Sequence, residues 1–347
     1  AKAGKAEAIN PCIACNQACL DHVFQRKIAS CLLNPRACHE TLLRYDLTTQ
    51  VKRLAVVGAG PAGLAFACTA ALRGHEVTLY EASGQIGGQL NLGKLIPGKE
   101  EFHGMLRHFI NQLNTLKVQV KLNTPISCEQ LIHEKFDDII LATGITPRKP
   151  EIPGINNPCV LSYIDVLQKK HAVGKRVAII GAGGIGFDVA TFLLLSANET
   201  KTHFARDWGI DFRVKYPGGL CFSKTPEKPA HHIYLLQRKE TKVGATLGKT
   251  TGWIHRHILK KHGVKMIPNV RYLNINDQEL QIRVNGEERR LSVDTIIICA
   301  GQTANRDLYT ALMDNKQRVH LIGGAACAKD LDAKQAIKQA CYLAAEL

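Results

Sequence analysis

The sequence predicts an α/β protein with two parallel-sheet domains that follow a cysteine-rich segment. A short apolar strand, a Gly-x-Gly-x-x-Gly turn and a helix occur together twice, first from Arg53 and again from Lys175. Ahead of the first repeat, five of the twelve cysteines lie between Cys12 and Cys38. Repeated strand–turn–helix units of this kind are typical of Rossmann-like dinucleotide-binding domains, so we expect one such domain around each turn.

The composition argues against several other classes of protein. A chain of 347 residues with 45% hydrophobic content is long enough for two or three domains with buried cores. The formal net charge is +15, but the lysines and arginines are scattered rather than gathered in one stripe, which argues against a nucleic-acid partner. No apolar segment reaches the ~20 residues of a membrane span, and residues 1–8 carry no secretory signal. We therefore expect a cytoplasmic protein without a membrane partner.

The cysteine-rich segment predicts an iron–sulfur cluster. Cys12, Cys15 and Cys19 place three thiols within eight residues, and Cys31 follows after eleven more. Three close cysteines and a distant fourth are typical of four-cysteine ligation of a 4Fe-4S cluster. Structural zinc is the alternative, although zinc sites more often use two separated close pairs. We assign no role to Cys38.

The first repeat predicts a nucleotide-binding site. A strand over 53–57 is followed by glycines at 58, 60 and 63, a helix over 64–73 and a strand over 75–80 that ends in Glu81. Such glycines permit a tight turn and close approach of the backbone to a pyrophosphate, at the positive end of the helix. Glu81 would bind ribose hydroxyls and repel a 2′-phosphate, which favours FAD or NAD over NADP. The alternative is a glycine-rich turn that only packs.

The second repeat predicts a different dinucleotide. A strand over 175–180, glycines at 181, 183 and 186 and a helix over 187–196 are followed by a polar insertion at 197–230 and a strand over 232–236. This last strand is not followed by an acidic residue; the next residues are Gln237-Arg238-Lys239. Arg238 and Lys239 can bind the 2′-phosphate of NADPH, which we therefore expect here. The alternative is that the two cations form a solvated strand end.

The segment after Glu81 assigns the first dinucleotide site to FAD. Gln85-Ile-Gly-Gly-Gln-Leu90 resembles the segment with which two-dinucleotide flavoproteins wrap FAD. Two further apolar strands, at 138–144 and 294–301, each run into a glycine and are expected to return the chain between domains. The predicted domains are residues 1–50 for the cluster, 51–150 with 295–347 for FAD, and 151–294 for NADPH.

The order of these parts predicts electron transfer. Nicotinamide gives up two electrons together as hydride, a cluster carries one, and a flavin can do both. We therefore expect electrons to pass from NADPH to FAD to the cluster.

Within the cluster segment we expect a helix from Leu20 to Ile28. The chain lacks an initial methionine and reaches Cys12 before any folded element, so we expect it to be part of a longer protein.

Five motifs carry a resemblance to one family, namely Cys12–Cys19, Cys31–Glu40, Val57–Gly63, Leu247–Arg256 and Val319–Gly324. Over essentially all of its length the chain resembles the C-terminal part of bacterial NADPH-dependent 2,4-dienoyl-CoA reductases, relatives of trimethylamine dehydrogenase and old yellow enzyme. The stretch Leu247–Arg256 is the most specific of the five, because few other flavoproteins share it.

The resemblance implies a set of cofactor-binding residues. Those expected at FAD are Gly58, Gly60, Ala62, Gly63, Glu81, Gln89, Ile126, Gly144, Gly301 and Ala333, the last at the start of a helix that would face the flavin ring. Those expected at NADPH are Gly181, Gly183, Ile185, Gly186, Arg238, Lys239 and Lys249, with Thr250 and Thr251 beside the phosphates. Ala326 stands where related flavoproteins carry an Asp that holds FAD, so we expect FAD binding to be weaker by ~1–3 kcal/mol.

The same resemblance implies a second half of the enzyme. In this family an FMN-containing (β/α)8 barrel, absent from this chain, reduces the dienoyl-CoA substrate in the β-oxidation of unsaturated fatty acids. We therefore assign no catalytic residue for that step here. One alternative is another enoate, or an amine, as the substrate of the barrel. Another is a zinc-stabilised nucleotide-binding module without catalysis.

Overall fold

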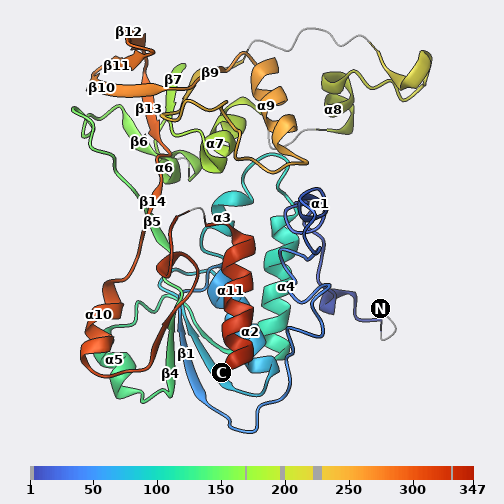
Figure 1. Cartoon of the computed structure of the whole chain (residues 1–347), viewed down its shortest axis with the longest axis vertical. Helices are drawn as coiled ribbons and strands as arrows, with labels where there is room; N and C mark the ends of the chain where they lie inside the picture. Colours follow the sequence, from blue (N-terminus) through green and yellow to red (C-terminus); the bar gives the residue numbers. More distant parts are fainter. Residues whose placement is uncertain (1–3, 169, 196–199, 222–228, 330) are drawn as a thin grey trace. The chain divides into compact units, whose positions relative to one another are not determined.

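The computed structural model describes residues 4–168, 170–195, 200–221, 229–329 and 331–347. The chain forms two compact units (Figure 1). The first consists of Ala1–Lys94, Glu100–Arg148 and Gly301–Leu347, and the second of Leu95–Lys99 and Lys149–Ala300. Each unit contains one parallel sheet with the strand–turn–helix repeat at its centre, which confirms the predicted α/β fold with two Rossmann-like sheets. The assignment of one domain to FAD and one to NADPH stays a prediction.

The first unit is built on a five-stranded parallel sheet. Its strands lie in the order β15 (Val319–Leu321), β4 (Asp138–Leu141), β1 (Arg53–Val57), β2 (Glu76–Tyr80) and β3 (Gln119–Lys121). β5 (Ile145–Pro147) and β14 (Gln302–Ala304) pair separately and antiparallel. Val57 lies opposite Tyr80, so β1 and β2 end at the same level and the residues after them share one edge of the sheet.

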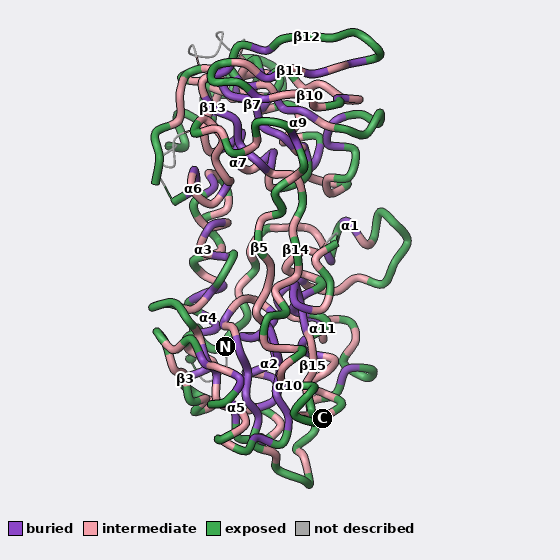
Figure 2. The backbone as a smooth tube through the Cα atoms, turned by 90° about the vertical axis from the view of Figure 1, so that its left-hand side faces the viewer, coloured by how far each residue is buried: buried purple, intermediate pink, exposed green. Residues whose placement is uncertain are grey.

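Alternate residues of β1 pack on opposite faces of this sheet. Leu54 and Val56 belong to the core under α2 (Pro61–Leu72), α4 (Phe102–Thr115) and α11 (Ala333–Glu346). Ala55 and Val57 belong to the core under α5 (Cys128–His133) and α10 (Asp307–Asp314). Because both faces are covered by helices, β1 and β4 are buried along almost all of their length, and Figure 2 shows buried backbone at the centre of the unit.

The second unit contains two sheets. Its parallel sheet has the strand order β6 (Val160–Ser162), β13 (Thr295–Ile298), β7 (Arg176–Ile180), β8 (His232–Leu236) and β9 (Lys265–Ile267). An antiparallel sheet of β10 (Val270–Asn276), β11 (Glu279–Val284) and β12 (Glu287–Ser292) shares a core with one face of it. α7 (Gly184–Leu194) contacts β7 and β8, and also α6 (Tyr163–Leu167) and α9 (Gly252–Lys261).

Helix boundaries differ from the sequence prediction. α2 begins at Pro61 and α7 at Gly184, earlier than expected, because the extended Gly60 and Gly183 are their N-caps. The helix expected over Leu20–Ile28 is wrong in length, since α1 ends at Val23.

A left-handed turn ends α1. Arg26 has φ of 56°, and the N–H groups of Arg26 and Lys27 donate to the carbonyl oxygens of Val23 and His22. This is the hydrogen-bond pattern of a Schellman turn, which cannot be continued as helix.

The polar insertion is partly helical. Its residues 197–199 and 222–228 lie outside the described part of the chain, whereas α8 (Lys201–Trp208) is capped by Thr200 and ends at the left-handed Gly209. Trp208 stacks on His257 of α9 with ring centroids 5.4 Å apart, so the insertion packs on the second unit. In the described ranges, no helix combines the length and apolarity needed to cross a membrane.

Candidate functional site

The first glycine turn is closed by backbone packing at two of its three glycines. A Cβ on Gly58 would lie 2.4 Å from the carbonyl oxygen of Ala142, and one on Gly63 would lie 1.9 Å from the carbonyl oxygen of Gly58. No side chain fits at such distances, and Gly58 also has φ of 105°. A Cβ on Gly60, by contrast, would meet no described atom within 4 Å. The middle glycine therefore faces the space where the predicted pyrophosphate would approach.

Glu81 lies directly beside this turn. It follows β2 at the level where Gly58 follows β1. Its Oε2 accepts a hydrogen bond of 2.8 Å from the N–H of Ala59, and its Oε1 accepts bonds of 2.8 Å from both the N–H and the hydroxyl of Ser83. These bonds fix the carboxylate at the sheet edge, where the sequence places a ribose-binding acid.

The segment predicted to wrap FAD returns to the same turn. The N–H of Gly87 donates to the carbonyl oxygen of Ala59 over 2.7 Å, and a Cβ on Gly88 would lie 3.0 Å from the Cα of Gly60. Gln89 follows, exposed, as the N-cap of α3 (Leu90–Gly93). The fold thus brings the glycine turn and this segment together, as the sequence predicts.

The residues around Ile126 and Gly144 lie at the same sheet edge. The N–H of Thr124 donates to the carbonyl oxygen of Glu81 over 2.9 Å, which ties residues 123–126 to the end of β2. Ile126 is buried in one core cluster with Tyr80. Gly144 follows β4 with φ of 74°, and within the described chain a Cβ there would meet nothing within 4 Å.

The C-terminal part of the unit completes this edge. A Cβ on Gly323 would lie 2.8 Å from the Cβ of Ala62, so the last strand and α2 meet at the glycine turn. Ala333 begins α11, and the carboxylate of Asp332 caps this helix by accepting the N–H of Gln335 over 2.8 Å. Ala326 offers only backbone, and its carbonyl oxygen accepts a hydrogen bond from Arg306.

Gly301 lies at the entrance to β14. It has φ of 94°, and its carbonyl oxygen accepts the N–H of Arg148 over 3.1 Å. A Cβ at this position would lie 3.3 Å from Nε of the same arginine. The structure therefore places Gly301 beside the β5–β14 pair, and its predicted contact with FAD stays a prediction.

The second glycine turn repeats the packing of the first. A Cβ on Gly181 would lie 2.3 Å from the carbonyl oxygen of Cys299, and one on Gly186 would lie 1.9 Å from the carbonyl oxygen of Gly181. A Cβ on Gly183 would meet no atom of the described residues within 4 Å. Ile185 is half-buried in the first turn of α7. Both turns thus leave the same middle position free for a ligand.

The two units differ at the residue opposite the turn. β7 and β8 end together, so Gln237 occupies in the second unit the position that Glu81 occupies in the first. Its Nε2 donates to the carbonyl oxygens of Lys239 and Thr241 over 3.0 and 2.7 Å. Arg238 and Lys239 are exposed on the short loop that these bonds shape. The sheet edge therefore presents two cations in place of an acid.

Lys249 lies on the connection between β8 and α9, and its side chain is exposed. This connection is anchored to α7, because a Cβ on Gly244 would lie 2.7 Å from the ring of Phe187. The guanidinium of Arg256 in α9 donates to the carbonyl oxygen of Gly244 over 2.8 Å. The loop that carries Lys249 is thus tied to the helix that begins at the second glycine turn.

One charged group near this turn was not predicted. Nζ of Lys99 lies 2.7 and 2.6 Å from the two carboxylate oxygens of Asp188 in α7. Burial, with the charge of Lys99, lowers the pKa of His255. Burial, with the charge of Asp188, raises the pKa of the Cys299 thiol. Asp188 is a lone acid in an apolar helix, and this was the only signal in the sequence for the group of interacting side chains around it.

The four predicted cluster ligands lie in one loop region of the first unit. Burial is the main cause that raises the pKa of the Cys15 thiol, and the thiols of Cys31 and Cys19 raise it further. Cys12 and Cys19 are exposed. No three His, Cys, Asp or Glu side chains of the described residues converge on a position for a single metal ion.

Backbone amides in this loop point at sulfur. The N–H of Ala14 donates to Sγ of Cys12 over 3.4 Å, and the N–H of Gln17 donates to the thiol of Cys15. Ala14 and Asn16 have left-handed φ values of 52° and 55°. Alternation of right- and left-handed residues turns successive N–H groups toward one side, an arrangement that is common at iron–sulfur sites.

Comparison with known proteins identifies the family. Residues 52–331, which include both glycine turns, match the family of pyridine nucleotide-disulphide oxidoreductases. The chain belongs to this family. Membership implies FAD and a pyridine nucleotide as cofactors and confirms the predicted resemblance to the flavoprotein part of such reductases. The chain is of the flavin-dependent oxidoreductase type, whereas its substrate and its preference for NADPH stay predictions.

Similar proteins are reductases of about twice this length. A metal reductase of Desulforamulus reducens is 32% identical over 339 residues, which are 94% of this chain and 48% of that protein. A cinnamate reductase of Clostridium sporogenes is 28% identical over 322 residues, 92% of this chain and 43% of that protein. The solved complex of 2-naphthoyl-CoA reductase with 2-naphthoyl-CoA matches with a TM-score of 0.83 at 26% identity, over 100% of this chain and 48% of that one. The chain thus spans about half the length of these proteins.

Proposed function

We propose that this chain oxidises NADPH and is the electron-input part of a reductase of the 2,4-dienoyl-CoA type. One observation carries the proposal: two glycine turns with the same packing are flanked by opposite charges. Glu81 lies beside the first turn, and Arg238 and Lys239 lie beside the second. A carboxylate binds ribose hydroxyls and repels a 2′-phosphate, whereas a guanidinium and an ammonium attract it.

FAD fits the residues of the first unit. Gly60 leaves the space in which a pyrophosphate could contact the N-terminus of α2, and Glu81 is held where a ribose would lie. Ala333 begins a 14-residue helix whose positive end would stabilise negative charge on the ligand. When bound, FAD would accept hydride and release single electrons.

NADPH fits the second unit on the same grounds. Gly183 leaves the equivalent space at the N-terminus of α7. Arg238 and Lys239 would bind the 2′-phosphate, and the exposed Lys249 would add charge near the pyrophosphate. The bonds from Gln237 would hold the two cations in place, because they fix the backbone of the loop.

A 4Fe-4S cluster fits Cys12, Cys15, Cys19 and Cys31. Donation from the N–H groups of Ala14 and Gln17 stabilises negative charge on sulfur, which is the form that binds iron. When bound, such a cluster would carry single electrons away from the chain. Analysis of iron and acid-labile sulfide distinguishes it from zinc: four of each per chain supports the cluster, and zinc without sulfide contradicts it.

The substrate proposal rests on the relatives of the chain and not on residues of the chain itself. The relatives named for cinnamate and 2-naphthoyl-CoA act on conjugated carboxylic acids or their thioesters, and each extends well beyond the part matched here. We therefore assign the reduction of a conjugated acyl-CoA, as in the β-oxidation of unsaturated fatty acids, to an FMN-containing barrel joined to this chain in the full-length protein.

The proposal is tested by anaerobic titration of the purified chain with NADPH and, separately, with NADH. The expected result is loss of flavin absorbance with NADPH, then of the broader cluster absorbance, and a response to NADH at least tenfold weaker. Equal responses to both nucleotides would contradict the roles of Arg238 and Lys239. A flavin that NADPH leaves oxidised would contradict the electron-input function as a whole.

A further inference from the structure

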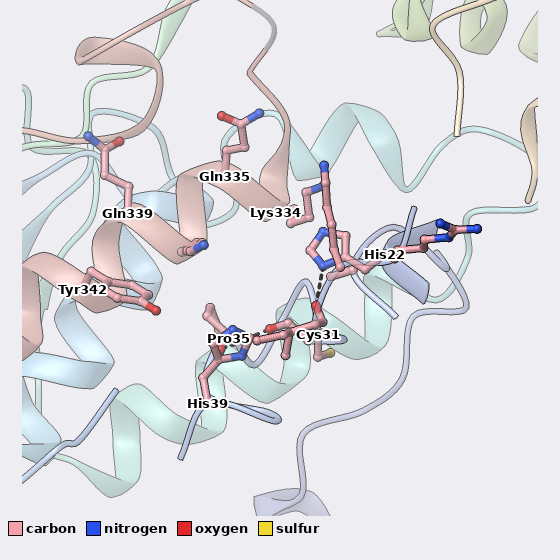
Figure 3. Close-up of a pocket in the computed structure, with 14 residues that line it drawn as sticks. His22, Cys31, Pro35, His39, Lys334, Gln335, Gln339 and Tyr342 are labelled. Carbon is pink, nitrogen blue, oxygen red and sulfur yellow. Dashed lines mark hydrogen bonds between the residues drawn. The ribbon is translucent and has the colours of Figure 1, made fainter. Parts of the chain in front are cut away.

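A cavity of about 830 Å³ lies between the cysteine-rich segment and α11 (Figure 3), and Cys31 is the one residue of its described lining to which the function proposed above gives a role. Six basic side chains line it: His22, Arg26, Lys27, His39, Lys334 and Lys338. None of the described residues that line it is acidic. The volume lies within the range of small-molecule sites, which is roughly 300–1,000 Å³.

The basic residues reach the cavity from segments far apart in the sequence. Lys334 and Lys338 lie one turn apart on α11, where like charges repel one another. Nζ of Lys334 donates to the carbonyl oxygen of Gln17 over 3.5 Å, which joins the helix to the cysteine loop. Nζ of Lys338 lies 5.5 Å from the ring centroid of Tyr342.

The opposite wall carries two histidines. Nδ1 of His22 donates to the carbonyl oxygen of Ile28 over 3.0 Å, and Nδ1 of His39 donates to that of Ala37 over 3.1 Å. These bonds fix both rings in the wall, and Figure 3 shows the bond made by His22. Arg26 and Lys27 are exposed at the same wall.

Such a concentration of positive charge favours a polyanionic occupant. The four lysine and arginine side chains around one cavity repel each other, and a ligand with several negative charges would relieve that repulsion while gaining charge-assisted hydrogen bonds. A single phosphate would fill little of this volume. A cavity of this kind admits a small molecule with several carboxylates more readily than the flat acidic surface of a protein.

The position of Cys31 indicates what such an occupant would do. This cysteine, one of the four proposed cluster ligands, also lines the cavity, so an occupant would lie beside the point at which single electrons leave the chain. We propose that the cavity binds an anionic ferric chelate of the citrate class and that the chelate is reduced there. This inference rests on the proposed NADPH oxidation. One NADPH and two ferric chelates give NADP⁺, one proton and two ferrous chelates.

The first test measures binding without electron transfer. Gallium(III) citrate, which is not reduced, is titrated calorimetrically into the purified holoprotein and into the double variant Lys27→Glu/Lys338→Glu. The matched control is Lys135→Glu/Lys316→Glu, two exposed lysines of the same unit outside the cavity. We expect binding to weaken at least tenfold in the cavity variant and less than twofold in the control. Equal weakening in both variants would mean general charge attraction and would overturn the inference.

The second test measures the rate of NADPH-dependent reduction of ferric citrate and of the cationic acceptor hexaammineruthenium(III). The cavity variant should reduce ferric citrate about tenfold more slowly, reduce the cation at least as fast, and bleach with NADPH as the parent protein does. An unchanged ratio of the two rates would overturn the inference.

If gallium citrate binds as expected but NADPH bleaches nothing, the proposed function fails and the anion site stands. If only an acidic polypeptide such as polyglutamate binds, the cavity is a protein-docking site instead.

Discussion

At the scale of single residues, the three glycines of each turn differ in what excludes a side chain. At Gly63 a side chain is excluded by the carbonyl oxygen of Gly58, 1.9 Å from the position of a Cβ, whereas at Gly60 only the proposed ligand would exclude one. Gly60 has φ of −77° and ψ of −177°, which any residue adopts. Packing and ligand binding can therefore be separated within one turn.

We predict opposite outcomes for two alanine substitutions in this turn. Gly63→Ala should lower the stability of the protein by about 3 kcal/mol, because backbone must move to admit the methyl group. Gly60→Ala should change stability by less than about 0.5 kcal/mol but weaken FAD binding at least tenfold. Thermal unfolding and flavin content after dialysis measure the two effects. Full retention of FAD in Gly60→Ala would contradict the proposed approach of the pyrophosphate.

Arg238 provides a second test at this scale. Its removal takes one charge-assisted hydrogen bond from the 2′-phosphate, worth about 1.5–3 kcal/mol. Arg238→Ala should therefore raise the KM for NADPH by about 10- to 100-fold and leave the KM for NADH within about twofold. Arg290→Ala, on an exposed part of β12, is the matched control and should change neither value. A parallel rise of both KM values in Arg238→Ala would point to a role in shaping the loop.

The candidate site was predictable from the sequence where residues act through local spacing. Gly58, Glu81 and Gly181 follow strands whose apolar pattern is unambiguous, and the structure brings them to the expected sheet edges. That Gln237 occupies the position in the second unit that Glu81 occupies in the first became clear only from the pairing register of β8. The Lys99–Asp188 pair and the cavity of His22 and Lys338 join residues about 90 and about 300 positions apart, and no local pattern reports such contacts.

At the scale of elements, strands were easier to predict than helix ends. β1, β4, β7 and β13 are buried on both faces, so an uninterrupted apolar run marks each of them. α1 was overestimated because Leu20, Val23, Phe24 and Ile28 have the spacing of an apolar helix face. All four are exposed, so no packing favours helix beyond Val23, and the turn at Arg26 ends it.

One prediction concerns the junction of β7 and β13. The carboxylate of Asp294 accepts hydrogen bonds from the backbone N–H and Nε of Arg176 over 2.8 and 3.0 Å. These bonds hold the pKa of Asp294 below its usual range. A lowered folded-state pKa stabilises the fold above the unfolded-state pKa of about 4, and this contribution is lost as the pH falls through the folded-state value.

Asp294→Asn should therefore lower the Tm at pH 7, and its difference from the parent protein should shrink below about pH 4. Calorimetric scans at several pH values measure both differences. Glu287→Gln, in an exposed ion pair with Arg289, is the control and should have little effect at any pH. A difference in Tm that stays constant between pH 7 and pH 3 would contradict the role of the Asp294 charge.

At the scale of the whole molecule, reduction of the flavin and release of electrons can be separated. Cys15→Ser removes one proposed cluster ligand and leaves the residues of both glycine turns unchanged, so FAD and NADPH binding should persist. The variant should lose its iron and reduce one-electron acceptors at least tenfold more slowly. NADPH should still bleach its flavin. Loss of FAD together with iron would mean that the cysteine segment is needed to fold the first unit.

The discontinuity of the first unit has a consequence during biosynthesis. β15 and α11 complete its sheet and core, yet the ribosome makes them only after the whole second unit has been synthesised. Until then the nascent chain carries β4, buried along its full length in the finished protein, as an unpaired edge. Such edges recruit other strands, so premature termination within residues 301–347 should yield aggregates or chaperone-bound chains rather than a smaller folded flavoprotein.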